Sequence, residues 1–209
     1  MLKQILTFSL AVFLCACAGG QLRQIPPQVR AGHKVDFFAG GHTQAAFKVD
    51  GRMDGSGLEG VLIVKKIGDE DFEVSVMTSG AYRVLQATVT PTGIAYRHLF
   101  ADADTAIIRG RINQFLSLLL LPPGDYQRYR VSSGVQTVTY KNDIAKVQLM
   151  YHTNETYPYA AKTITLLNTA DLFYNEYTPA DENGLIHVPH ELVYQDGNIE
   201  ITLTLISLK

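Results

Sequence analysis

Apolar and polar residues alternate along most of the chain after residue 44, and turn residues interrupt the alternation about every eight to twelve positions. The clearest case is FEVSVMT (residues 72–78), in which Phe72, Val74 and Val76 point to one side and the residues between them to the other. Related patterns occupy residues 44–52, 58–67, 81–89 and 94–100. Together these segments predict a meander of antiparallel strands.

The pattern changes between residues 102 and 124, where DADTAIIRGRINQFLSLLLLPPG has helical features. Asp102, Asp104 and Thr105 are suited to the start of a helix, and Pro122 with Pro123 ends it. Gly110 either kinks this helix or divides it in two. The segment FLSLLLL (115–121) is apolar nearly all round, so it must be covered on more than one side. The sequence leaves open whether it is core, a lid or a plug.

Strand patterns resume after Pro123 and end in a hairpin of residues 190–195 and 199–207, joined by the turn at 196–198. We therefore expect a mainly β, antiparallel protein of about eleven strands with one or two helices. The apolar concave face of a curved sheet is filled either by side chains or by a ligand. A generic β-sandwich and a closed, lipocalin-like barrel are the alternative architectures.

The N-terminus, MLKQILTFSLAVFLCACAGG, has the charged, apolar and small-residue order of a secretory signal. Its apolar run is about half as long as the ~20 residues that span a bilayer. The residues Leu14-Cys15-Ala16-Cys17 resemble the bacterial lipobox. This resemblance implies that residues 1–16, including Cys15, are removed and that Cys17 is acylated with chains such as palmitate. An ordinary signal cut after Ala16 or Ala18 is the alternative.

Two acyl chains on Cys17 are enough for a stable membrane anchor. Residues 17–34 are rich in Gly, Gln and Pro and are predicted to be a tether, followed by a single β-domain at 35–209. Ala18, rather than Asp, follows Cys17. By resemblance to enterobacterial sorting, this residue favours the outer membrane over the inner membrane, with the domain facing the periplasm.

Composition and motifs exclude several classes of function. The formal net charge of −2 offers no electrostatic support for nucleic-acid binding, and the absence of cysteines after Cys17 excludes a disulfide scaffold. His187 and His190 flank Pro189 and would point to opposite faces of an extended segment, so we expect no metal site and no cofactor. No catalytic set is assembled, so we expect that the protein is not an enzyme, and an envelope hydrolase is disfavoured.

Tyrosines gather in YHTNETYPYAA (151–161), where Tyr157 and Tyr159 flank a proline. Tyrosine is apolar with a polar tip, so these side chains are suited to a cavity mouth or a membrane surface. A packed loop is the alternative.

The closing hairpin VPHELVYQDGNIEITLTL (188–205), the lipobox and the order meander, apolar helix and further strands resemble the lipoprotein carrier and receptor group (LolA/LolB-like). The resemblance covers about residues 35–208. It implies an unclosed, half β-barrel whose helices cover an apolar cavity for acyl chains. The expected cavity residues are Leu62, Val64, Phe72, Val74, Val76, Leu85, Val89, Phe115 and Leu119.

Two features differ from the receptor members of that group. The turns GDED (68–71) and TSGA (78–81) carry no Leu or Trp at the tip, and the chain contains no Trp. The resemblance therefore extends to the lipid-binding scaffold rather than to lipoprotein insertion. We expect a membrane-anchored protein that binds an acyl chain, lipid or lipoprotein. The alternative is an assembly subunit that docks with an envelope protein and takes no small ligand.

Overall fold

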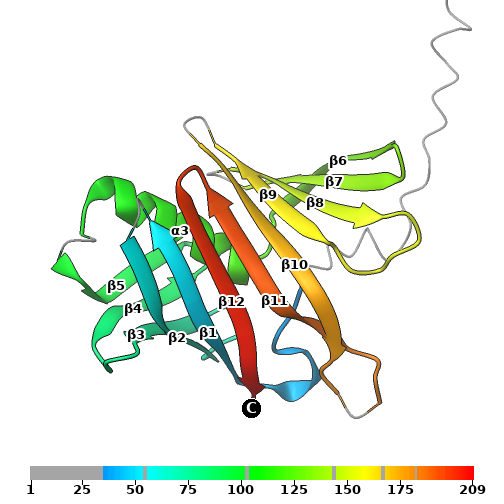
Figure 1. Ribbon diagram of the computed structural model, residues 1–209. Coiled ribbons are helices and arrows are strands. Elements are labelled where there is room, and N and C mark those ends of the chain that lie inside the picture. Colours follow the sequence, from blue (N-terminus) through cyan, green and yellow to red (C-terminus); the bar gives the residue numbers. More distant parts are fainter. Residues whose placement is uncertain (1–34, 54–55, 102–103, 143–144, 166–167, 182) are drawn as a thin grey trace, which may run out of the picture.

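The alternating segments form one antiparallel sheet of twelve strands, with an α-helix against its concave face (Figure 1). The computed structural model describes residues 35–53, 56–101, 104–142, 145–165, 168–181 and 183–209. The expected fold class, mainly β with an unclosed sheet of about eleven strands, is confirmed, with twelve strands among the described residues.

The chain builds the sheet in two runs that flank the helix. The first run is β1 (Gln44–Met53), β2 (Ser56–Lys66), β3 (Phe72–Thr78), β4 (Arg83–Thr90) and β5 (Gly93–Leu99). The second run is β6 (Asp125–Ser132), β7 (Val135–Lys141), β8 (Lys146–His152), β9 (Ala160–Ile164), β10 (Thr169–Pro179), β11 (His187–Asp196) and β12 (Ile199–Leu208). We call these runs the N-terminal half and the C-terminal half of the sheet.

The two halves are joined by β1 and β12, which pair in the middle of the sheet. The strand order is β5-β4-β3-β2-β1-β12-β11-β10-β9-β8-β7-β6, so β5 and β6 are the two edges. A closed barrel has no edges, and a sandwich has two sheets. The observed topology therefore rules out both alternative architectures.

The helix α3 (Ala106–Leu120) connects the two edges of the sheet. Its first turn is capped as predicted, because the backbone N–H of Ile108 donates to Oγ1 of Thr105 at 3.3 Å. Gly110 lies within one continuous helix and does not divide it. The helix ends at Leu120, where Pro122 and Pro123 cannot extend it, and Gly124 turns the chain with a φ of 99°.

An N-terminal segment (residues 35–43) leads into β1 and includes the short 3-10 helix η1 (Ala39–Gly41). Phe37 packs edge-on against Phe47 of β1, and Phe38 packs against Phe72 of β3, with ring centroids 5.2 and 5.4 Å apart. Nε2 of His42 lies 2.9 Å from the carbonyl oxygen of Ala180 after β10. The segment thus contacts both halves of the sheet at the end where the C-terminus lies (Figure 1).

Candidate ligand-binding site

The concave face of the N-terminal half carries seven of the nine residues predicted to line a cavity. They are Leu62, Val64, Phe72, Val74, Val76, Leu85 and Val89, and each is at most 9% exposed. Strand register brings them together, because Leu62 lies opposite Val76 and Val64 lies opposite Val74. Val76 in turn lies opposite Leu85 of β4. The result is a continuous aliphatic surface across β2, β3 and β4.

The helix supplies the other two predicted residues, Phe115 and Leu119. Its buried side chains are Phe115, Leu116, Leu118 and Leu119. The ring of Phe115 packs edge-on against Tyr194 of β11, with centroids 5.1 Å apart. All nine predicted residues therefore belong to one apolar cluster between α3 and the sheet. Contact of these residues with a ligand stays a prediction.

In this structure the cluster is a packed core. Leu116 of α3 and Val64 of β2 are fully buried, so the leucine-rich segment fills the space between helix and sheet. A ligand can occupy this interface only if α3 moves away and its apolar contacts are replaced.

The concave face of the C-terminal half differs because it holds tyrosines. Tyr140, Tyr151, Tyr174 and Tyr194 are each at most 4% exposed. Burial raises the pKa of each of these phenols, and neighbouring tyrosines add to the effect at Tyr151 and Tyr174. Among the described residues, the buried hydroxyl of Tyr174 has no hydrogen-bond partner. These side chains place hydroxyl groups inside an otherwise apolar face.

A buried carboxylate anchors the helix to this half. Asp196, at the end of β11, is 1% exposed and accepts a 2.5 Å hydrogen bond from the side-chain amide of Asn168. The Tyr194 hydroxyl donates to its other oxygen at 3.4 Å, and Nε of Arg111 on α3 lies 3.8 Å from the same oxygen. A second polar contact joins the Gln114 amide of α3 to the Thr163 hydroxyl of β9. We call these two contacts the helix latch.

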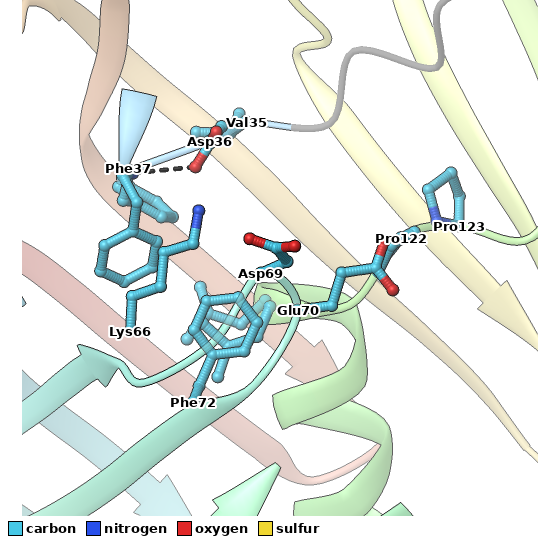
Figure 2. A pocket seen from close by; sticks show the side chains of 12 residues that line it. Val35, Asp36, Phe37, Lys66, Asp69, Glu70, Phe72, Pro122 and Pro123 are labelled. Atoms are coloured by element: carbon cyan, nitrogen blue, oxygen red, sulfur yellow. Dashed lines mark hydrogen bonds between the residues drawn. The ribbon is translucent and has the colours of Figure 1, made fainter. Parts of the chain in front are cut away.

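A cavity of about 210 Å³ opens at the C-terminal end of α3 (Figure 2). Its apolar lining comes from the N-terminal segment, β3, α3 and the residues after the helix, and consists of Val35, Phe37, Phe38, Phe72, Leu119, Leu120, Pro122 and Pro123. Its charged lining consists of Asp36, Lys66, Asp69 and Glu70. Phe72 and Leu119 are the two predicted cavity residues that line it.

Sequence reasoning missed two parts of this site. Phe37 and Phe38 lie just after the predicted tether, separated from it by Val35 and Asp36, and the apolar pair in VDFF is the available signal that the chain packs there. The position of Asp196 at the start of DGN predicts a turn residue. No local pattern shows that Arg111 and Asn168 meet it, since both lie far from it in the sequence.

The tyrosine-rich loop is packed rather than free. Tyr157 stacks on Tyr177 with ring centroids 5.1 Å apart, and Tyr159 stacks on His152 at 4.3 Å. Both loop tyrosines are half-buried. The alternative interpretation as a packed loop therefore accounts for these contacts.

The remaining predictions concern the N-terminus, metal binding and membrane spans. Cys15, Cys17 and the tether lie outside the described residues, and so does Asp102. The described residues contain no group of three or more His, Cys, Asp or Glu side chains arranged to hold a metal ion. Within the described ranges, no helix combines the length and apolar character required to cross a membrane.

Comparison with known proteins supports the fold. No family model matches the sequence, and no curated protein matches it. A LolA superfamily protein from Nitrosomonas europaea superimposes with a TM-score of 0.56 at 13% sequence identity, covering 80% of this chain and 85% of that one. An outer membrane lipoprotein-sorting protein domain from Vibrio parahaemolyticus gives a TM-score of 0.50 at 8% identity, covering 87% and 89%. The chain therefore has a LolA-like fold.

Proposed function

We propose that the domain binds the acyl chain of a lipid or lipoprotein between α3 and the N-terminal half of the sheet. In the same proposal, Cys17 anchors the protein to the outer membrane, the domain faces the periplasm, and the protein acts as a carrier or receptor without catalysing a reaction. The similarity to LolA-like structures supports this function through the shared fold.

One observation carries the proposal: the buried side chains of α3 belong to the same apolar cluster as those of β2, β3 and β4, and α3 contacts β4 directly. Among the described residues, the buried polar side chains are Thr139, Thr163 and Asp196, and all belong to the C-terminal half. An acyl chain that replaces α3 on these three strands breaks no buried hydrogen bond. It restores about 0.8 kcal/mol for each methylene that it buries.

The edge strand β5 makes a polar contact with the helix, but this contact is exposed. The Tyr96 hydroxyl donates to Oδ1 of Asn113 at 2.5 Å, and the guanidinium of Arg109 lies 5.3 Å from the centre of the Tyr96 ring. Water can replace exposed contacts at little cost. In the helix latch, Asp196 and Thr163 are buried, so water replaces their contacts with α3 less readily, and α3 is expected to separate from the N-terminal half first.

Native mass spectrometry of the full chain carrying Cys17→Ser tests the proposal. Bound masses of fatty-acid or phospholipid size, present after gentle purification or after incubation with lipid, are the expected result. Protein that remains free of lipid after incubation, with no binding of a fluorescent fatty acid, contradicts it. A variant with a loosened latch, Asp196→Asn, should take up the fluorescent fatty acid faster, while the exposed control Asp50→Asn should not differ.

The packed interface favours a second candidate, an assembly subunit without a small ligand. Three large apolar side chains are exposed on or near the helix and its neighbouring strands, namely Tyr82 (77%), Phe100 (52%) and Ile107 (73%). A protein partner could cover such side chains. The lipid-free outcome of the same experiment moves the assignment to this candidate.

A further inference from the structure

The cavity at the C-terminal end of α3 combines an apolar floor with an acidic rim. Phe37, Phe38 and Phe72 form much of the floor, and all three are at most 6% exposed. Asp69 and Glu70 belong to the turn between β2 and β3, and Figure 2 shows Glu70 extending across the opening towards Pro122.

The rim has an excess of negative charge. Three carboxylates, those of Asp36, Asp69 and Glu70, face a single ammonium group, that of Lys66. Among the described residues, none of these four side chains forms an ion pair. Asp36 accepts a hydrogen bond from the Phe38 N–H at 2.9 Å, whereas no hydrogen bond within the described residues involves the Asp69 or Glu70 carboxylate.

The local fold does not require these two carboxylates. Backbone hydrogen bonds close the turn, since the N–H groups of Ile67 and Gly68 both donate to the carbonyl oxygen of Asp71. The carboxylates also lie next to the C-terminal end of α3, whose last turn has no basic residue. A helix C-terminus carries partial negative charge and favours cations. The rim therefore places carboxylates beside the negative end of the helix dipole, and the last turn of the helix has no basic residue to balance their charge.

The size of the cavity limits its occupant. At about 210 Å³ it exceeds the roughly 150 Å³ of an engineered apolar cavity that admits benzene, but it is smaller than the roughly 300–1,000 Å³ of ligand pockets. One short length of alkyl chain fits such a space, and two acyl chains do not.

We propose that this cavity accepts an alkyl amphiphile with a positively charged amino head group, its chain on the phenylalanine floor and its ammonium group among Asp36, Asp69 and Glu70. The inference rests on the proposed lipid binding and specifies the head group that binding favours. Lys66 limits the preference because it is the basic residue among the described residues that line the cavity.

Three probes of equal chain length test the head group: octylamine, octanol and octanoate. Their dissociation constants are measured by NMR titration of the full chain carrying Cys17→Ser, at low ionic strength and again in high salt. Octylamine should bind about tenfold more tightly than octanoate at low salt, with octanol between them, because Coulomb attraction is then weakly screened. The difference should shrink in high salt.

Matched charge variants assign the preference to the rim. The double variant Asp69→Asn, Glu70→Gln should weaken octylamine binding about fivefold and leave octanol binding unchanged. The control Asp50→Asn, Glu59→Gln removes two carboxylates that face each other on β1 and β2, and should change neither affinity. Lys66→Gln should strengthen octylamine binding. The unfolding midpoint of each variant shows that the fold is retained.

The outcomes separate the two proposals. If the three probes bind equally, or octanoate binds best, the head-group inference is overturned while lipid binding stands. If no probe binds here but a long-chain fatty acid binds the protein, the cavity assignment alone is overturned. If neither the probes nor the fatty acid bind, both proposals fail.

Discussion

The N-terminal and C-terminal halves of the sheet hold the same helix by different means. The N-terminal half presents aliphatic and phenyl groups, while the C-terminal half adds buried tyrosines and Asp196. Apolar contacts are non-directional, so they allow α3 to be replaced by another apolar group. Buried hydrogen bonds and charges require particular partners, so they determine where α3 lies. The comparison indicates that the C-terminal half fixes the position of α3, and that α3 can separate from the N-terminal half.

The largest expected effect is a loss of stability at alkaline pH, which arises from the buried tyrosines of the C-terminal half. Burial raises the pKa of Tyr151, Tyr174 and Tyr194, so these phenols stay protonated in the folded state after the unfolded chain begins to ionise near pH 10. Stability is therefore complete below pH 10 and falls as the pH rises above it. Three such tyrosines predict a loss of about 3 kcal/mol between pH 10 and pH 11. Urea unfolding across this range measures the loss, and a flat profile contradicts the burial.

Truncation of a side chain on the apolar face of the N-terminal half should lower the stability of the protein. Leu62 is 1% exposed on β2, and Leu62→Ala is expected to cost about 2–5 kcal/mol of unfolding free energy because it leaves a cavity. Leu149→Ala, at an equally buried position on β8, is the matched variant in the other half. Denaturant titration measures both. If Leu62 is replaced at no cost, the packed interface described above is incorrect.

Removal of the Asp196 carboxylate tests the latch. Asp196→Ala leaves the Asn168 amide and the Tyr194 hydroxyl without their acceptor, and is expected to cost about 2 kcal/mol. Arg111 is one-third exposed and can regain water, which keeps the loss below that of a fully buried ion pair. Hydrogen exchange of the α3 amides should accelerate more than exchange of the β3 amides. Equal acceleration in both elements would show that Asp196 supports the whole fold and not the helix position.

The smallest effect should be a gain. The Tyr174 hydroxyl has no partner among the described residues, so Tyr174→Phe removes a buried polar group at no cost and should stabilise the protein by about 1 kcal/mol. The Tyr174→Phe variant should also lose less unfolding free energy between pH 10 and pH 11, because one buried phenol no longer contributes to that loss. Tyr194→Phe, which removes a hydrogen bond to Asp196, is the contrasting variant and should destabilise the protein. A loss of stability in Tyr174→Phe would show that its hydroxyl has a bound partner.

Local patterns were sufficient to predict the elements of this protein. The alternation at 72–78 predicted β3 at its observed bounds, and Thr105 with the two prolines located the ends of α3. Side-chain direction in a strand and the capping of a helix depend on residues a few positions apart, so the sequence contains the necessary information. Alternation also predicted which side of β3 and β4 faces the core, where Phe72, Val74, Val76, Leu85 and Val89 are buried.

The tertiary structure alone decided how those elements meet. The pairing of β1 with β12 sets the edges of the sheet, and it joins residues from opposite ends of the domain. Packing also decided that the leucines of α3 fill the concave face, because a leucine run has the same pattern as core, lid or plug. Asp196 acquired its partners from α3 and from Asn168, just before β10, and Asp69 with Glu70 acquired an apolar floor from the N-terminal segment. Each of these relations depends on distances between segments far apart in the chain, which local periodicity does not record.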